Sequence, residues 1–278
     1  MAEIRDFLKK HCLITLIVAE VFALAGIYFI YAEEYFFAAL QRFILVLAMC
    51  PLLYLISGNK TFDASNKKTF WKTFKPLIIF SFYTLFMAVV GVAGMIFANT
   101  GLVSNWPLQL ITMTIYVISV GFIEELVFRA IAFDAIMYKF RNSKHVFWVS
   151  ALVISLFFGV THVVGAEFVD AVSVVQAVLK TVSTALLGLG MLFMYWKTRN
   201  VVGIALGHAL YDFFAFFVQA VFASGGEEAG NSYVATGASG VANVVIYIIQ
   251  ITALSIFCLV IYLKHVRKID FNEMRKSW

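Results

Sequence analysis

The chain has 278 residues, of which 62% are hydrophobic and 13% are charged, and its formal net charge at pH 7 is +5. Soluble domains average roughly half apolar and a quarter charged residues, so this composition excludes an ordinary soluble globular protein. The apolar runs approach about twenty residues and exceed the roughly ten-residue alternating segments of an outer-membrane barrel. We therefore expect an all-α, polytopic membrane protein.

Apolar spans of about twenty residues are predicted, in chain order, near 12–32, 36–57, 77–98, 108–133, 146–165, 171–195, 201–222 and 241–263. They indicate a single transmembrane domain over residues 1–278, a bundle of about eight helices, with a motif-bearing core near 108–222. The cysteines lie inside apolar runs without C-x-x-C spacing, which argues against a disulfide framework or a thiolate metal site.

The charges of the connecting loops alternate and predict an orientation. One set of loops and the two termini carry 18 of the 21 Lys and Arg residues, including Arg5, Lys9 and Lys276. The opposite loops carry acidic residues: Glu33, Glu34, Glu167, Asp170, Glu227 and Glu228. By the positive-inside rule we expect a multi-pass protein of the cell membrane with both termini cytoplasmic. The basic balance is thus a topology signal, and we expect no nucleic-acid partner.

A cluster of charges inside the fourth predicted span is the first candidate for function. Glu124, Glu125 and Arg129 lie in an otherwise apolar run, where an ionised side chain costs several kcal/mol unless it is paired or wetted. Glu125 and Arg129 are four residues apart, so on a helix they share a face and neutralise each other. Glu124 points about 100° away from Glu125 and is left free to face a cavity.

Two further spans carry polar pairs at the same helical spacing. In the fifth, Phe158 and His162 share a face, and Gly159 between them allows close helix approach. In the seventh, His208 and Asp212 stack in the same way. Other intramembrane polar residues are interpreted separately. Gln41, Arg42 and Lys180 are expected to snorkel toward the membrane surface, whereas Glu20 is either paired with another helix or a titrating site.

The three motifs, in this order on membrane helices, resemble those of a known family. Glu-Glu-x-x-x-Arg at 124–129, Phe-x-x-x-His at 158–162 and His-x-x-x-Asp at 208–212 are similar to the CPBP family, also called Abi. The family comprises CAAX prenyl proteases and bacteriocin-processing enzymes. The similarity covers roughly residues 120–215, about a third of the chain.

The resemblance implies an intramembrane glutamic-type endopeptidase that hydrolyses a membrane-associated or prenylated peptide or protein, without a cofactor. Glu124 and His162 would activate water, and His208 and Asp212 would form the oxyanion site. Glu125, Arg129 and Phe158 would support them. Many members carry Asn where this chain has Asp212. A neutral amide donates a hydrogen bond to an oxyanion, whereas a carboxylate donates only when protonated.

The residues also allow other interpretations. Glu124, His162 and His208 are ligand types that suit zinc, which makes a zinc-dependent protease the mechanistic alternative, although no His-Glu-x-x-His occurs. A catalytically silent membrane scaffold or a bacteriocin self-immunity protein of the same fold is a second alternative. A proton-coupled transporter, with Glu20, Glu124 and Lys180 as relay groups, is a third. The expected partners are the lipid bilayer and a peptide or protein substrate, lipidated or not.

Helix lengths raise one conflict with a shared site. If the spans begin at residues 146 and 201 at the same membrane surface, His162 lies about 24 Å deep and His208 about 10 Å at 1.5 Å per residue. The sequence then predicts that residues 134–148 form a cytoplasmic amphipathic segment and that the fifth span begins well after 146, or that a helix is tilted or broken.

Overall fold

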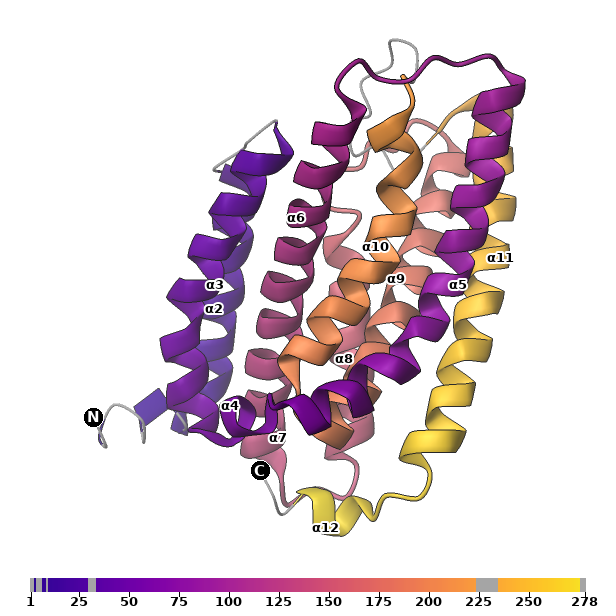
Figure 1. Ribbon diagram of the computed structural model, residues 1–278. Coiled ribbons are helices and arrows are strands. Elements are labelled where there is room, and N and C mark those ends of the chain that lie inside the picture. The colour runs from indigo at the N-terminus through magenta and orange to yellow at the C-terminus, as the bar shows by residue number, and fades with distance from the viewer. Residues whose placement is uncertain (1–2, 4–6, 9, 30–33, 224–234, 276–278) are drawn as a thin grey trace.

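The structure is a computed structural model that describes residues 3, 7–8, 10–29, 34–223 and 235–275. Arg5, Lys9 and Lys276, the acidic Glu33, Glu227 and Glu228, and both chain ends lie outside the described residues. The described residues form helices and no strand, which confirms the predicted all-α class. Figure 1 shows these helices running side by side in one bundle.

Six helical segments are long and apolar enough to cross a membrane. They are α3 (Tyr35–Ser57), α5 (Lys67–Phe97), the continuous run of α6 (Trp106–Glu124), η1 (Glu125–Phe133) and α7 (Asp134–Phe140), α9 (Ala171–Thr198), α10 (Val201–Val221), and α11 (Gly237–Ile261) with η2 (Tyr262–Val266). Two of the eight predicted spans correspond to shorter helices, α2 (Cys12–Phe29) and α8 (Val146–Thr161). The polytopic membrane class is confirmed.

The connection between the predicted spans 36–57 and 77–98 is mostly helical. It contains the short α4 (Lys60–Ala64) and the first turns of α5, which begins at Lys67 because the Asn66 side chain accepts hydrogen bonds from the amides of Lys68 and Thr69. Asn200 is fully buried and ties the start of α10 to this region, since its side-chain amide donates a hydrogen bond to Thr69 Oγ1 at 2.8 Å. The short α12 (Phe271–Arg275) lies at the same end of the bundle (Figure 1).

The bundle is apolar on its outside as well as in its core. Exposed large hydrophobic side chains occur along the outer helices, among them Leu47 of α3, Phe86 of α5 and Ile256 of α11. Such an extensive exposed apolar surface does not suit a monomeric protein in water. It fits contact with lipid chains. The most buried of the six long segments is α9, which packs between α8 and α11.

Two glycines bring the motif-bearing helices close together. A Cβ atom at Gly121 of α6 would collide with the backbone carbonyl oxygen of Ala205 in α10, and one at Gly159 of α8 would collide with that of Thr181 in α9. The expected close approach at Gly159 is therefore confirmed. These contacts place α6 against α10 and α8 against α9, with the three motifs on the facing surfaces.

We predict that Gly121→Ala destabilises the protein. The added methyl group has no room against the α10 backbone, and overpacking of this kind costs about 1–3 kcal/mol. Thermal unfolding in detergent measures the effect. Gly94→Ala is the matched control, because a Cβ there meets no atom within 4 Å and a helix gains stability from alanine. A melting temperature that falls equally in both variants contradicts the prediction.

Candidate functional site

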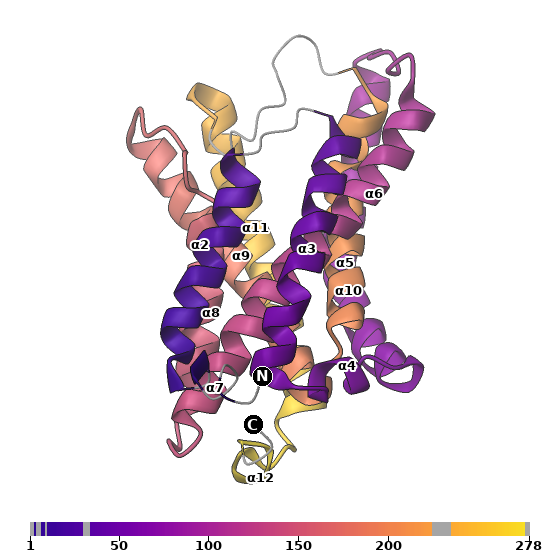
Figure 2. The same ribbon diagram turned by 90° about the vertical axis from the view of Figure 1, so that its left-hand side faces the viewer.

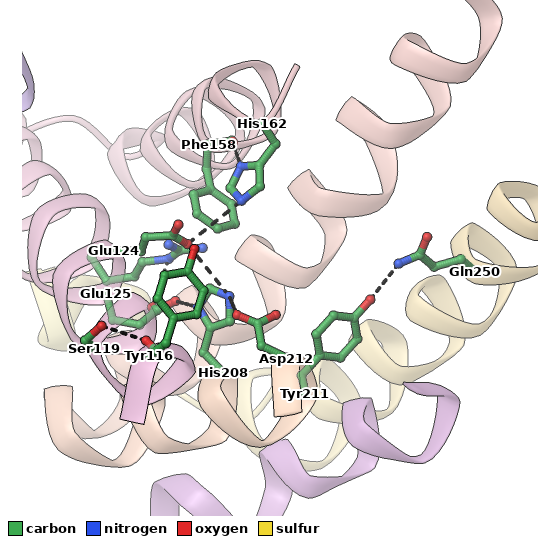
Figure 3. Close-up of polar contacts among 11 residues, drawn as sticks. Tyr116, Ser119, Glu124, Glu125, Phe158, His162, His208, Tyr211, Asp212 and Gln250 are labelled. Carbon is green, nitrogen blue, oxygen red and sulfur yellow. Dashed lines mark hydrogen bonds and ion pairs between the residues drawn. The ribbon is translucent and has the colours of Figure 1, made fainter. Parts of the chain in front are cut away.

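The candidate site lies where regular α-helix ends in two of the packed helices. Glu124 is the last residue of α6, and the chain continues as the π-helix η1 from Glu125. His162 is the C-cap residue of α8. Single turns of π-helix occur frequently at functional sites, and non-helical backbone at membrane depth is tolerated where protein buries it or where it lines a wet cavity. Figure 3 shows the side chains of both segments turned toward one another.

Glu125 and Arg129 form the predicted ion pair. Arg129 Nε lies 3.2 Å from Glu125 Oε2, and both side chains are fully buried. The guanidinium carbon lies 4.1 Å from the centre of the Phe158 ring, so Phe158 joins α8 to the pair by a cation–π contact. A Cβ at Gly188 of α9 would lie 2.6 Å from Arg129 Nη2. Gly188, which sequence analysis missed, therefore makes the space that the guanidinium fills.

His208 of α10 connects this pair to the other acids. Its Nδ1 lies 2.8 Å from Glu125 Oε1, and because an ionised carboxylate only accepts, Nδ1 is the donor. On the other side of the ring, Nε2 lies 3.8 Å from Glu124 Oε2 and 3.6 Å from Asp212 Oδ2. The His208 side chain is only 3% exposed. Three carboxylates on two helices thus surround one buried imidazole (Figure 3).

His162 approaches Glu124 from α8. Its Nδ1 lies 2.8 Å from the Phe158 carbonyl oxygen, which can only accept, so Nδ1 carries the hydrogen. In a neutral ring the lone pair is then on Nε2. That Nε2 atom lies 3.9 Å from Glu124 Oε2, beyond the roughly 2.7–3.2 Å of a direct hydrogen bond. Within the described structure, Glu124 Oε2 is buried and accepts no hydrogen bond.

These contacts resolve the conflict over helix depth. The structure starts α8 at Val146, so the predicted later start of the fifth span is wrong. His162 and His208 nevertheless both lie within 4 Å of Glu124 Oε2, so α8 and α10 do not run straight from a common level. In both views the turn between α7 and α8 lies at the lower end of the bundle (Figures 1 and 2).

The end of α8 lies well inside the bundle. Phe147 stacks near Trp196 with ring centroids 4.2 Å apart, while Gly159 packs on Thr181. The first turns of α9, from Ala171 to Lys180, therefore extend beyond the last turn of α8. At 16 residues, α8 is about 24 Å long, shorter than a membrane core of about 30 Å. His162 thus lies at the end of a helix that is too short to cross such a core.

Part of the site is accessible. The side chains of Glu124, His162 and Asp212 are 19%, 21% and 14% exposed, whereas Glu125 and Arg129 are not exposed at all. Glu125 and Arg129 therefore lie at the buried floor of the site. The other three side chains line its accessible side. Tyr116, also missed by sequence analysis, lies two turns before Glu124 on α6, and the Arg42 guanidinium lies 4.8 Å from its ring centre.

Glu20 also belongs to the surroundings of the ion pair. It lies on α2 with 5% of its surface exposed, and its charge interacts with that of Arg129. Both of its carboxylate oxygens are buried without a hydrogen-bond partner among the described residues, so pairing with another helix and a titrating site both stay predictions. The placement of Glu20 brings α2 into electrostatic contact with the segment that carries the central charges.

A second buried polar cluster fixes the far end of the π-helix. Asp134, directly after η1, accepts a hydrogen bond from Ser57 Oγ at 2.6 Å and lies 3.7 Å from Arg199 Nη2. Thr61 contacts both Asp134 and the hydroxyl of Tyr195. Sequence analysis missed this cluster because an acid at the end of a span, among basic residues, is indistinguishable from a solvated charge.

The zinc alternative can be compared with the donor set. Across the described part of the chain, no group of three or more His, Cys, Asp and Glu side chains has an arrangement that could hold a metal ion. Glu124 Oε2 lies 3.9 Å from His162 Nε2 and 3.8 Å from His208 Nε2. The three side chains therefore face one another. The mechanism derived from these side chains uses no metal.

The fold and this cluster define a class: polytopic membrane proteins in which acidic and histidine side chains from several helices meet inside the bundle. Residues 105–214, about two-fifths of the chain, match the family model described as type II CAAX prenyl endopeptidase Rce1-like. All three motifs fall inside the matched segment. The match confirms, for this segment, the CPBP or CAAX-protease family recognised in the sequence. Comparisons with curated proteins and with solved structures gave no match.

We predict that Arg129→Met strongly destabilises the protein, because it leaves Glu125 buried without a counter-charge. Removing one partner of a buried pair costs about 3–5 kcal/mol. The double variant Arg129→Met, Glu125→Gln should recover part of that loss. Unfolding of the purified variants in mixed micelles provides the comparison. Equal stability of the single and double variants would show that the pair carries no such coupling, and half-buried Arg42→Met is the control for loss of an arginine.

Proposed function

We propose that this protein is an intramembrane endopeptidase in which Glu124 and His162 activate a water molecule. The proposed substrate is a membrane-associated peptide or protein. The family description suggests that this substrate is prenylated. In this proposal His208 and Asp212 belong to the oxyanion site, with His208 as the donor, while Glu125, Arg129 and Phe158 position the reacting groups. The family match supports a protease of the CAAX type, and the geometry supports this division of labour.

One observation carries the proposal. Glu124 Oε2 and His162 Nε2 face each other at 3.9 Å, and with Nδ1 of His162 donating to a carbonyl, both atoms are acceptors. Two facing acceptors do not satisfy each other. Water, with two O–H donors, satisfies both, and the same contacts orient its oxygen lone pair away from them. The geometry therefore suits a positioned nucleophilic water.

The proton balance follows from the same contacts. Glu124 takes one proton from the water as its oxygen attacks the scissile carbonyl carbon, and the carbonyl oxygen becomes an oxyanion. Collapse of the tetrahedral intermediate breaks the C–N bond, and Glu124 returns the proton to the leaving nitrogen. A positioned group that accepts and returns a proton contributes typically about 10²–10⁴-fold. His162 holds the water and needs no change of protonation.

His208 is suited to the opposite face of the reaction. With Nδ1–H donated to Glu125 at 2.8 Å, Nε2 donates as well only in the imidazolium form. The neighbouring carboxylates of Glu125 and Asp212 stabilise that cation. Its Nε2–H would then be a charged donor that faces the open side of the site. A charged donor stabilises an oxyanion more strongly than a neutral one.

We predict that Glu124→Gln lowers kcat at least about 100-fold while the protein remains folded, because the amide cannot accept a proton. The measurement is cleavage of a farnesylated fluorogenic peptide with a C-terminal C-a-a-X sequence, and of its unprenylated counterpart, by protein in detergent or liposomes. Glu167→Gln, on an exposed loop, is the matched control and should retain wild-type turnover.

The outcomes separate the alternatives. Equal turnover by wild type and Glu124→Gln overturns the glutamate mechanism. Absence of turnover by the folded wild type on all peptides favours a silent scaffold or self-immunity protein. A chelator should have no effect, and inhibition that zinc reverses would support the metal-dependent mechanism instead.

We also propose that the end of the bundle that carries α4, α7 and α12 faces the cytoplasm. Figure 2 shows these three elements together at one end, and the connections and helix ends there hold most of the Lys and Arg residues. Cytoplasmic loops carry such an excess. Within the described loops at the opposite end, Glu34, Glu167 and Asp170 are the charged residues of the connections.

Single-cysteine labelling tests this orientation. In a chain whose native cysteines are replaced by alanine, Ser143→Cys in the α7–α8 turn should react with a membrane-impermeant maleimide only after permeabilisation. Ser104→Cys, in the α5–α6 connection, should react in intact cells. The reverse pattern would invert the proposed orientation without affecting the proposed chemistry.

A further inference from the structure

The proposed oxyanion site lacks a donor at one position. Asp212 Oδ2 lies 3.6 Å from His208 Nε2, where an amide side chain would offer an N–H group. An ionised carboxylate has no hydrogen to donate. It would also repel the negative charge that forms on the carbonyl oxygen. A nearby cation with N–H donors would remove both difficulties.

Lys180 lies on the face of α9 that turns toward the site. Gly188, on this face, contacts Arg129 and Phe158, and Thr184, one turn earlier, is buried. Lys180 follows at the next turn of the same stripe, because residues four apart share a face. The adjacent Thr181 packs directly against Gly159, three residues before His162 on α8. The Lys180 side chain is half-buried.

The charges around Lys180 are those of the site. Its ammonium interacts electrostatically with the carboxylates of Asp212 and Glu124, and it lies close enough to His162 for the two to influence each other. Lys180 is about 14 Å along α9 from Ala171 at 1.5 Å per residue, and the carboxylates that interact with it belong to other helices of the bundle. Its charge therefore has to be balanced inside the bundle.

Two other intramembrane cations, Arg129 and Arg42, lie near the acids of the site. Arg129 pairs with Glu125 at 3.2 Å. Arg42 lies over the Tyr116 ring, and its charge interacts with Glu124. The cations that interact with the Asp212 carboxylate include Lys180 and the two imidazoles.

We propose that Lys180 supplies the oxyanion donor that Asp212 cannot, with the Asp212 carboxylate holding the ammonium in place. Lys180 and Asp212 together then do the work of a single neutral amide. The ammonium offers three N–H donors and a full positive charge, so it can pair with Asp212 and still donate to the oxyanion. This inference rests on the proposed peptidase function and assigns one further residue to it.

A two-by-two comparison of Lys180→Met and Asp212→Asn tests the inference. Lys180→Met alone should lower kcat about 100-fold with little change in KM, because an oxyanion contact is made only in the transition state. In Asp212→Asn the amide becomes a donor itself. The double variant should therefore cleave at least about ten times faster than Lys180→Met alone, and melting temperatures establish that each variant is folded.

The control is Arg42→Met, which removes a cation that interacts with Glu124. Its effect on turnover should not be relieved by Asp212→Asn. If Lys180→Met does not fold, Lys180→Gln replaces it in the same comparison and should give the same recovery.

Two results would overturn the inference alone: wild-type turnover in Lys180→Met, or no recovery when Asp212→Asn is added. The proposed function fails in a different way. In that case the wild type cleaves none of the peptides, or Glu124→Gln cleaves as fast as the wild type, and the role of Lys180 falls with it.

Discussion

The buried ion pair between Glu125 and Arg129 is the interaction on which the rest of the site depends. A buried charge is costly unless an opposite charge or a polar group lies close to it, and neither side chain of this pair is exposed. The surroundings come from different helices: the Phe158 ring covers the guanidinium, Gly188 leaves room for it, and His208 donates to the second carboxylate oxygen. The need to bury one pair therefore fixes how α8, α9 and α10 meet η1.

The backbone around that pair departs from regular helix where the chemistry is proposed. The π-helix η1 begins at Glu125 and ends at Phe133, and Asp134 anchors its far end through Ser57 and Arg199. The two carboxylates at 124 and 125 point in separate directions, as successive residues of a helix do. Glu125 faces the arginine and the interior, and Glu124 faces the partly open side. A regular helix would give the same 100° offset but would continue past the site without the wider turn.

The sequence predicted the helical class and the local pairs because both depend on short-range spacing. Apolar runs of sufficient length identify spans, and the interval of four residues predicted that Glu125 meets Arg129. The depth of His162 could not be obtained in this way, since counting residues assumes straight helices that start at a common level. Gly188, Tyr116 and Asp134 were missed for a related reason. Each acquires its place from helices distant in sequence, and none has a local pattern that distinguishes it.

The two histidines differ in the group that accepts a hydrogen bond from Nδ1, and this difference decides whether Nε2 is an acceptor or a donor. His162 donates Nδ1–H to a neutral carbonyl at 2.8 Å, which favours a neutral ring with an acceptor at Nε2. His208 donates Nδ1–H to a carboxylate at the same distance, which stabilises the imidazolium and so a donor at Nε2. Both Nε2 atoms face the same Glu124 oxygen. An acceptor on one side and a donor on the other is the polarity that hydrolysis requires, since water must be deprotonated on one side while the carbonyl oxygen gains charge on the other.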